Sequence, residues 1–190
     1  MRLTIVALSL CTSCISGGAL TEKSEPSGVR YFAVQVFGGV APARVDGAPA
    51  RVRLGHVTSS ANLRRRIVRR RSDVELDAYE SWRWTENPED YVTRALFQEH
   101  QPLELTSATN APILDVDVVS FEEVDIQHQR SGRVVLAYRL YDDQKVLAHG
   151  LIAPERPATS DSIEAVIAAI GDAMRIAVSQ LSSEVAARVQ

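Results

Sequence analysis

Towards the end of the chain, apolar residues recur every three or four positions. This series predicts one long amphipathic helix over about residues 161–188, whose apolar face covers a sheet. A shorter helix is predicted over about residues 88–100, because Asn87 can cap its start, Pro88 suits the first helical position and Pro102 follows its end. The apolar residues of the long helix are Ile163, Ile167, Ile170, Met174, Ala177, Leu181, Val185 and Val189.

Seven segments have the composition or the alternation of β-strands. In one of them, Asp115 and Asp117 alternate with Val116 and Val118, as expected for a strand with one solvated face. Strands and helices come in the order strands, helix, strands, helix, which predicts an α+β class: a single domain with a mostly antiparallel mixed sheet and two helices packed on it. The predicted strands span residues 29–37, 51–57, 66–70, 74–84, 114–121, 133–141 and 145–153.

The N-terminus has the features of an export signal. A basic start and a short apolar run, too short to span a bilayer, precede small residues and Cys14. This pattern resembles the lipobox of bacterial lipoproteins, in which the cysteine is acylated and becomes the new N-terminus. Cys11 is the alternative modified residue, but it would put bulky Leu10 beside the cleavage point. An ordinary secretory signal with incidental cysteines is the other alternative.

Three parts of the chain follow from this interpretation. Residues 1–13 are the predicted signal peptide, and residues 14–28 are a lipidated cysteine with a flexible tether that reaches roughly 20 Å. Residues 29–190 are the predicted domain, since a chain of 190 residues with 45% apolar content suits one core. Ile15, rather than an aspartate, follows Cys14, which favours attachment to the outer membrane, facing the periplasm.

Composition narrows the classes of function. Both cysteines, Cys11 and Cys14, lie in the N-terminal segment, so the domain has no disulfide, thiolate metal site or cysteine nucleophile. The net charge of −3 argues against a generally basic nucleic-acid binder.

Charge is unevenly distributed along the chain. Residues 44–71 contain nine arginines and one acid, whereas residues 72–125 contain fourteen acids and two arginines. One interpretation is a basic surface that meets anionic lipid headgroups or an acidic partner. The other, which we favour for most of these arginines, is neutralisation by acids on neighbouring strands. The candidate partner or lipid contacts are Arg64, Arg65, Arg66, Arg69, Arg70 and Arg71.

The chain has no recognisable catalytic motif, and we expect no enzyme activity, cofactor or metal. Asp115 and Asp117 could hold a hard cation, but a solvated strand face explains them as well. Glu122 and Glu123 are expected to be exposed. Histidines and tryptophans are the remaining candidate residues. The histidines are expected at the surface or in loops. The tryptophans are expected in the core, with stacking on a ligand as the alternative. These residues are His56, His100, His128 and His149, and Trp82 and Trp84.

Several segments in this order resemble the ABC-type transport auxiliary lipoproteins, the family that includes the paraquat-inducible protein C lipoprotein. Besides Cys14, they are a first strand at residues 31–34, a leucine and arginine-ended strand at residues 63–71, and residues 83–88, which are similar to the family's R-W-x-E-x-P helix start. The strand segments 114–121 and 134–141 and the long C-terminal helix follow.

The resemblance implies a non-enzymatic, auxiliary subunit of an ABC/MCE-type transport system for lipid or organic solvent. The protein would be held at the periplasmic face of the outer membrane by its lipid anchor, with an MCE-domain subunit as its partner. Phospholipid binding and a homo-oligomer are left open, and no nucleic acid is expected. The alternative is an assembly factor of another envelope or secretion machine.

Overall fold

The computed structural model describes residues 28–35, 48–98, 102–127, 129–143 and 145–189. The predicted signal peptide, Cys14 and most of the tether therefore lie outside the described residues. The elements are β1 (Arg30–Phe32), β2 (Ala50–Ser59), β3 (Arg66–Arg70), β4 (Leu76–Trp84), α1 (Pro88–Gln98), β5 (Leu103–Leu105), β6 (Ile113–Ile126), β7 (Gln129–Asp142), β8 (Lys145–Ile152), β9 (Glu155–Pro157) and α2 (Ile163–Val189).

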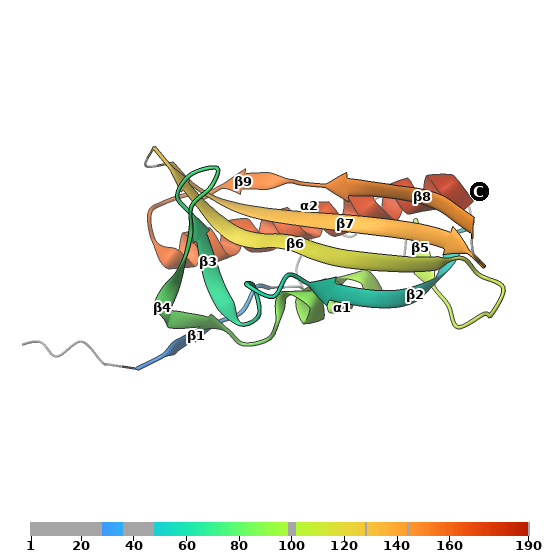
Figure 1. Cartoon of the computed structure of the whole chain (residues 1–190), viewed down its shortest axis with the longest axis horizontal. Coiled ribbons are helices and arrows are strands. Elements are labelled where there is room, and N and C mark those ends of the chain that lie inside the picture. Colours follow the sequence, from blue (N-terminus) through green and yellow to red (C-terminus); the bar gives the residue numbers. More distant parts are fainter. Residues whose placement is uncertain (1–27, 36–47, 99–101, 128, 144, 190) are drawn as a thin grey trace, which may run out of the picture.

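A long antiparallel hairpin of β6 and β7, each of 14 residues, runs the length of the domain (Figure 1). Each strand carries two shorter strands, one after the other, along its outer edge. On β6 these are β2 and then β3, both parallel to it, and on β7 they are β8 and β9, both antiparallel. Beyond β3 the sheet continues through β4 to β1, and beyond β2 it ends at β5.

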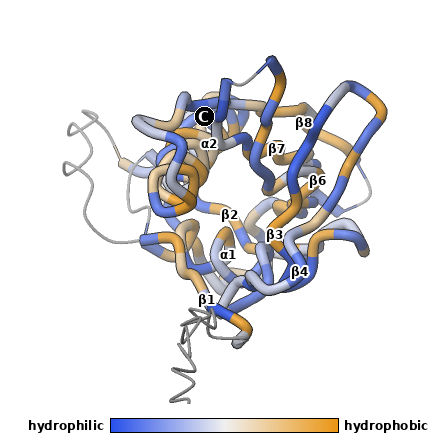
Figure 2. Tube along the Cα trace, turned by 90° about the vertical axis from the view of Figure 1, so that its left-hand side faces the viewer, coloured by the Kyte–Doolittle hydropathy of each residue, from blue (hydrophilic) through white to orange (hydrophobic). Residues whose placement is uncertain are grey.

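The helix α2 forms the second layer because its repeating apolar residues need a surface to cover. It packs mainly on β7, and α1 lies beside it on the same side of the sheet (Figure 2). α2 is long and apolar enough to cross a membrane. However, 61% of its apolar 18-residue stretch is buried inside the domain, so it serves here as a core helix. Gly132 on β7 lets α2 approach closely, since a Cβ there would lie 2.2 Å from the Ile170 nitrogen.

The start of α1 follows the local signals in the sequence. The backbone N–H of Asp90 donates to the Asn87 carbonyl (3.0 Å), and the Asn87 N–H donates back to the Asp90 carboxylate (3.3 Å). Tyr91 then packs against Trp84 and Phe121 in an aromatic cluster beneath the helix, with all three side chains almost fully buried. The segment that resembles the family's helix start therefore joins β4 and α1 to the core.

The structure confirms the predicted α+β class, with a mixed sheet whose longest ladders are antiparallel. Both helices occur at the predicted places, and the hairpin between β7 and β8 turns at Asp143, which has a φ of 48°. The predicted strand 29–37 is shorter in the structure, because only Arg30–Phe32 pairs with β4, although residues 36 and 37 lie outside the described residues. The three-residue strands β5 and β9 were not predicted.

Candidate functional site

The arginine-rich segment 63–71 divides into two parts of different character. The turn that leads into β3 and ends on its first residue, Arg66, carries Arg64, Arg65 and Arg66, all exposed, while Leu63 beneath it is only 1% exposed. After two buried residues, the second half of β3 and the residue after it carry three more arginines, which reach acids on neighbouring strands. The second group consists of Arg69, Arg70 and Arg71.

Within the second group, Arg69 makes a two-pronged contact with Asp77 on β4. Its Nε and Nη2 donate to the two carboxylate oxygens at 3.0 and 2.8 Å, and its guanidinium lies 4.7 Å over the Tyr79 ring. The hydrogen bond from Arg69 holds the pKa of Asp77 below its ordinary value, with a smaller contribution from Arg71. Arg71 also reaches Asp125 at 3.1 Å. Neutralisation across strands, the favoured interpretation, describes this group.

Glu122 is buried, with a side chain only 2% exposed, which corrects the prediction that it lies at the surface. Arg70 donates to it through Nε (2.8 Å) and Nη2 (3.3 Å), and Arg133 approaches the same carboxylate at 3.0 Å. Parallel pairing of β3 with β6 brings Arg70 beside this part of β6. A buried carboxylate keeps its charge where such donors replace water, so this cluster compensates itself.

Glu123 is fully buried on the opposite side of β6, where it also corrects the predicted exposure. It accepts hydrogen bonds from Arg130 Nε at 2.6 Å and from the Tyr79 hydroxyl at 2.7 Å. Burial and this donation to Glu123 raise the pKa of Tyr79 to about 12. Arg130 also donates to the Asp161 carbonyl, just before α2. The cluster therefore ties β4, β6 and β7 to the start of the long helix.

Asp115 and Asp117 lie on the solvated face of β6, as predicted, and alternate with the buried Val116 and Val118. The backbone N–H of His56 donates to Asp115 at 2.8 Å. Although burial raises the pKa of Asp115, the donors from His56 and from Arg139 outweigh it and lower that pKa overall. Asp117 accepts from a β2 side chain, the hydroxyl of Thr58, at 2.9 Å. Among the residues that the structure describes, no three His, Cys, Asp or Glu side chains gather as a metal site.

The remaining candidate residues either pack in or beside the core or lie at the surface. Trp84 is fully buried, as predicted, and Trp82 packs at the edge of the core against Phe32 and Tyr79. The histidines of the described residues, His56 and His149, are exposed, also as predicted. The other two, His100 and His128, lie outside the described residues.

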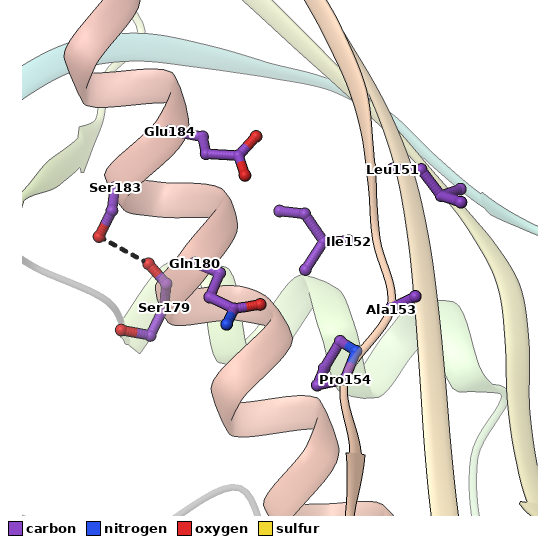
Figure 3. Close-up of a pocket in the computed structure, with 8 residues that line it drawn as sticks. All are labelled: Leu151, Ile152, Ala153, Pro154, Ser179, Gln180, Ser183 and Glu184. Carbon is purple, nitrogen blue, oxygen red and sulfur yellow. Dashed lines mark hydrogen bonds between the residues drawn. The ribbon is translucent and has the colours of Figure 1, made fainter.

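One pocket, of about 530 Å³, lies between the end of β8 and α2 (Figure 3). Figure 3 shows Ile152 turned towards the helix and Leu151 turned away from it. The Glu184 carboxylate on its helix side accepts the Tyr138 hydroxyl at 2.8 Å, and Ser183 donates to the Ser179 carbonyl at 2.9 Å. Burial and the bond to Glu184 raise the pKa of Tyr138 to about 12. Of these bonds, the one between Tyr138 and Glu184 holds the helix to the sheet, and the one between Ser183 and Ser179 lies within α2.

A larger pocket, of about 760 Å³, lies at the other end of the domain, near the β6–β7 turn. Arg130 and Arg133 line it, and both are already held by the buried glutamates. A third, of about 390 Å³, lies between β1 and α2 and has Phe32 and Ile167 in its wall. These pockets are surfaces for binding, but the strongest charges that line them are already paired within the protein.

The comparison that decides the identity is a family match over most of the chain. The family described as the ABC-type transport auxiliary lipoprotein component matches residues 38–186. The chain belongs to this family. The resemblance stated from the sequence is thereby confirmed. As a member of a lipoprotein family, this auxiliary lipoprotein is anchored to a membrane of the cell envelope and works with an ABC-type transport system.

Solved structures similar to this auxiliary lipoprotein show the same fold. A protein from Xanthomonas campestris, of family DUF330, is 21% identical with a TM-score of 0.68, covering 80% of this chain and 92% of that one. An uncharacterised protein is 11% identical with a TM-score of 0.64, covering 82% and 97%. A hypothetical protein from Chlamydia trachomatis is 8% identical with a TM-score of 0.51, covering 75% and 98%. No curated protein matches the chain.

The sequence pointed to the arginines of this auxiliary lipoprotein but not to the buried glutamate clusters, of which only Glu122 binds the second arginine group, through Arg70. Glu122 and Glu123 were assigned to the surface because adjacent charges usually lie there. Tyr79 was not selected at all. The signal for these clusters was the excess of acids that follows the excess of arginines. Lipid attachment at Cys14 and contacts by the six arginines with a partner or lipid stay predictions.

Proposed function

We propose that this protein is an outer-membrane-anchored periplasmic lipoprotein and a non-catalytic, auxiliary subunit of an ABC/MCE-type system that transports lipid or organic solvent. The family match over residues 38–186 carries the proposal. The segment from Arg83 to Pro88 supports it, because it is the most specific part of the resemblance to the family and it joins β4 to α1.

The non-catalytic part of the proposal has its own support in how the polar groups are used. Glu122 accepts hydrogen bonds from two arginines, Glu123 accepts from Arg130 and the Tyr79 hydroxyl, and Asp115 and Asp117 each accept a hydrogen bond from β2. Carboxylates bonded in this way stabilise the fold, and we do not expect them to transfer a proton to a substrate or to act as nucleophiles. We therefore assign the domain a binding and docking role.

The proposal is tested by purifying the tagged protein from native membranes in mild detergent and identifying the bound proteins and lipids by mass spectrometry. Recovery of an MCE-domain subunit is the expected result, and phospholipid in a fixed ratio would make the domain part of the transport route. Recovery of a secretion or outer-membrane assembly protein, without a transport subunit, would refute the proposal in favour of an assembly factor.

The anchor is tested separately by Cys14→Ala, with Cys11→Ala as the matched control. We expect the first variant to leave the membrane fraction as a folded protein and the second to stay there, because acyl chains on residue 14 supply the binding energy. Retention of Cys14→Ala with release of Cys11→Ala would move the anchor to residue 11. Separation of inner and outer membranes from the wild type checks the outer-membrane location.

A further inference from the structure

Three consecutive arginines project from the turn between β2 and β3. Arg64, Arg65 and Arg66 are exposed, and none of them forms an ion pair with another residue that the structure describes. In lacking ion pairs they differ from the second arginine group, whose side chains pair with carboxylates. Three positive charges side by side repel one another. An arginine cluster without carboxylate partners is therefore expected to bind an anionic surface.

The turn that presents these arginines is held by the backbone and the core. Leu63 is buried, its N–H donates to the Ser60 carbonyl at 2.9 Å, and the Arg66 N–H donates to the Leu63 carbonyl at 2.9 Å. The Arg65 carbonyl accepts the Trp84 N–H at 2.8 Å. The backbone of the turn is therefore fixed in position, and little backbone conformational entropy is lost when the arginines meet a partner.

Two neighbouring strands extend the surface in register. Arg66 on β3 pairs with Arg83 on β4, and Arg83 pairs with Tyr31 on β1. Arg83 donates to the carbonyls of Tyr79 and Trp82 at 2.7 and 2.8 Å, which fixes its guanidinium without neutralising it. Tyr31 is 61% exposed, although it is a large amphipathic side chain, and tyrosine favours the boundary between water and lipid headgroups.

The acids at and just before the start of α1 bond to groups other than these arginines. Glu86 pairs with Arg94, Glu89 accepts the Ser59 hydroxyl at 2.5 Å, and Asp90 accepts the Asn87 N–H at 3.3 Å. The positive potential of the turn is therefore not cancelled by ion pairing with the start of α1.

We infer that this surface contacts the anionic phospholipid headgroups of the membrane to which the protein is anchored. We call it the arginine-turn surface, and it consists of Tyr31, Arg64, Arg65, Arg66 and Arg83. β1, which carries Tyr31, is the first strand after the predicted tether in the sequence, so the domain begins at this surface. The inference rests on the proposed lipid anchor and gives the domain a second, electrostatic contact with the bilayer.

The expected strength follows from the charge of the turn. Each arginine near an anionic leaflet favours contact by about fivefold, so the three arginines of the turn together favour it by roughly 100-fold. This term weakens as salt screens the surface. A domain held by its tether within roughly 20 Å of the bilayer is thus expected to rest on it with the arginine turn facing the headgroups.

The test uses the full lipidated chain reconstituted in vesicles, with an environment-sensitive fluorophore on a cysteine placed in the turn by Asn62→Cys. Asn62 is exposed, and the chain's own cysteines lie at positions 11 and 14, in the signal peptide and at the predicted acylation site. We expect the probe to report an apolar, lipid-like environment in phosphatidylethanolamine vesicles that contain phosphatidylglycerol, and to lose that signal without phosphatidylglycerol or at high salt. A probe placed by Gln180→Cys, on the exposed side of α2, is expected to stay in water.

The charge variants make the test specific. Combined Arg64→Gln, Arg65→Gln and Arg66→Gln is expected to abolish the lipid signal, while the matched loss of three exposed arginines elsewhere, by combined Arg156→Gln, Arg175→Gln and Arg188→Gln, retains it. Equal signals with and without phosphatidylglycerol, or an unchanged signal in the turn variant, would overturn the inference.

The inference and the proposed function fail separately. Recovery of the transport subunit without a lipid signal in the turn would overturn the headgroup contact alone. Loss of the transport subunit in the turn variant, together with no lipid signal in the wild type, would reassign the surface to a protein partner. A lipid signal without any transport subunit would leave the contact standing and refute the proposed function.

Discussion

A close approach between the two layers of the domain can be tested at Gly132. A Cβ at this position would lie 2.2 Å from the Ile170 nitrogen and 2.5 Å from the Ala169 carbonyl carbon. Both are backbone atoms of α2, so no side chain can turn aside, and the helix would have to move by about 1 Å to restore ordinary contact. Overpacking costs about 1–3 kcal/mol, and this rigid contact places Gly132→Ala at about 3 kcal/mol or above.

A second glycine, on another side of α2, provides the control. A Cβ at Gly171, inside α2, would meet Val34 at 3.6 Å, which is ordinary van der Waals contact. Because alanine favours a helix interior by about 1 kcal/mol over glycine, Gly171→Ala is expected to leave the free energy of unfolding unchanged or to raise it by up to that amount. Urea unfolding followed by circular dichroism measures both variants. A Gly132→Ala variant within about 0.5 kcal/mol of the wild type would refute the close packing of α2 on β7.

Three further predictions concern the arginine segment. Arg70→Gln leaves buried Glu122 with one arginine and is expected to cost about 2–4 kcal/mol in urea unfolding, whereas Arg65→Gln is expected to stay within about 0.5 kcal/mol; equal losses would contradict the division of the segment. The pKa of Asp77 is lower in the folded state than in the unfolded state, so Asp77 adds stability above about pH 4, the unfolded value, and this stability is lost as the pH falls further. Asp77→Asn should therefore lower the free energy of unfolding at pH 7 and lower it less at pH 3. A difference from the wild type that does not change with pH would exclude this linkage. Leu63→Ala leaves a cavity under the turn and is expected to cost about 2–4 kcal/mol by the same assay, with a smaller loss meaning that the turn collapses into the space.

Much of this fold could be predicted from local patterns, and the reasons are physical. The repeat of apolar residues in α2 and the capping signals at Asn87 and Pro88 act within one or two turns of helix, so the sequence carries them directly. The alternation around Asp115 likewise predicted the solvated face of β6. In contrast, β5 and β9 have three residues each, too few for any period to show, and β9 includes Pro157. They exist because β2 and β7 offer edges to pair with.

The buried glutamates could not be predicted by the same means. β6 shifts register against β7 between Val118 and Ser120, so alternation read from the first half of the strand does not carry into the second. Beyond the shift, Glu122 and Glu123 are covered from both sides by groups distant in the sequence, including Arg70 from β3 and the start of α2 through Arg130. Burial of a charge depends on such partners, and they become visible only when the strands are paired.

The position of β3 explains why one run of arginines has two roles. Its end pairs with β6 beside the buried carboxylates, where an arginine replaces water and closes a low-dielectric cluster, as Arg70 does for Glu122. Its start lies four residues earlier, where Arg66 pairs with Arg83 of β4, no described carboxylate pairs with Arg65 or its neighbours, and the charge faces solvent. Charges in the first position are part of folding, since removing one leaves a buried acid short of a partner. Charges in the second position add little to folding, so affinity for an anionic surface is the property through which they can act.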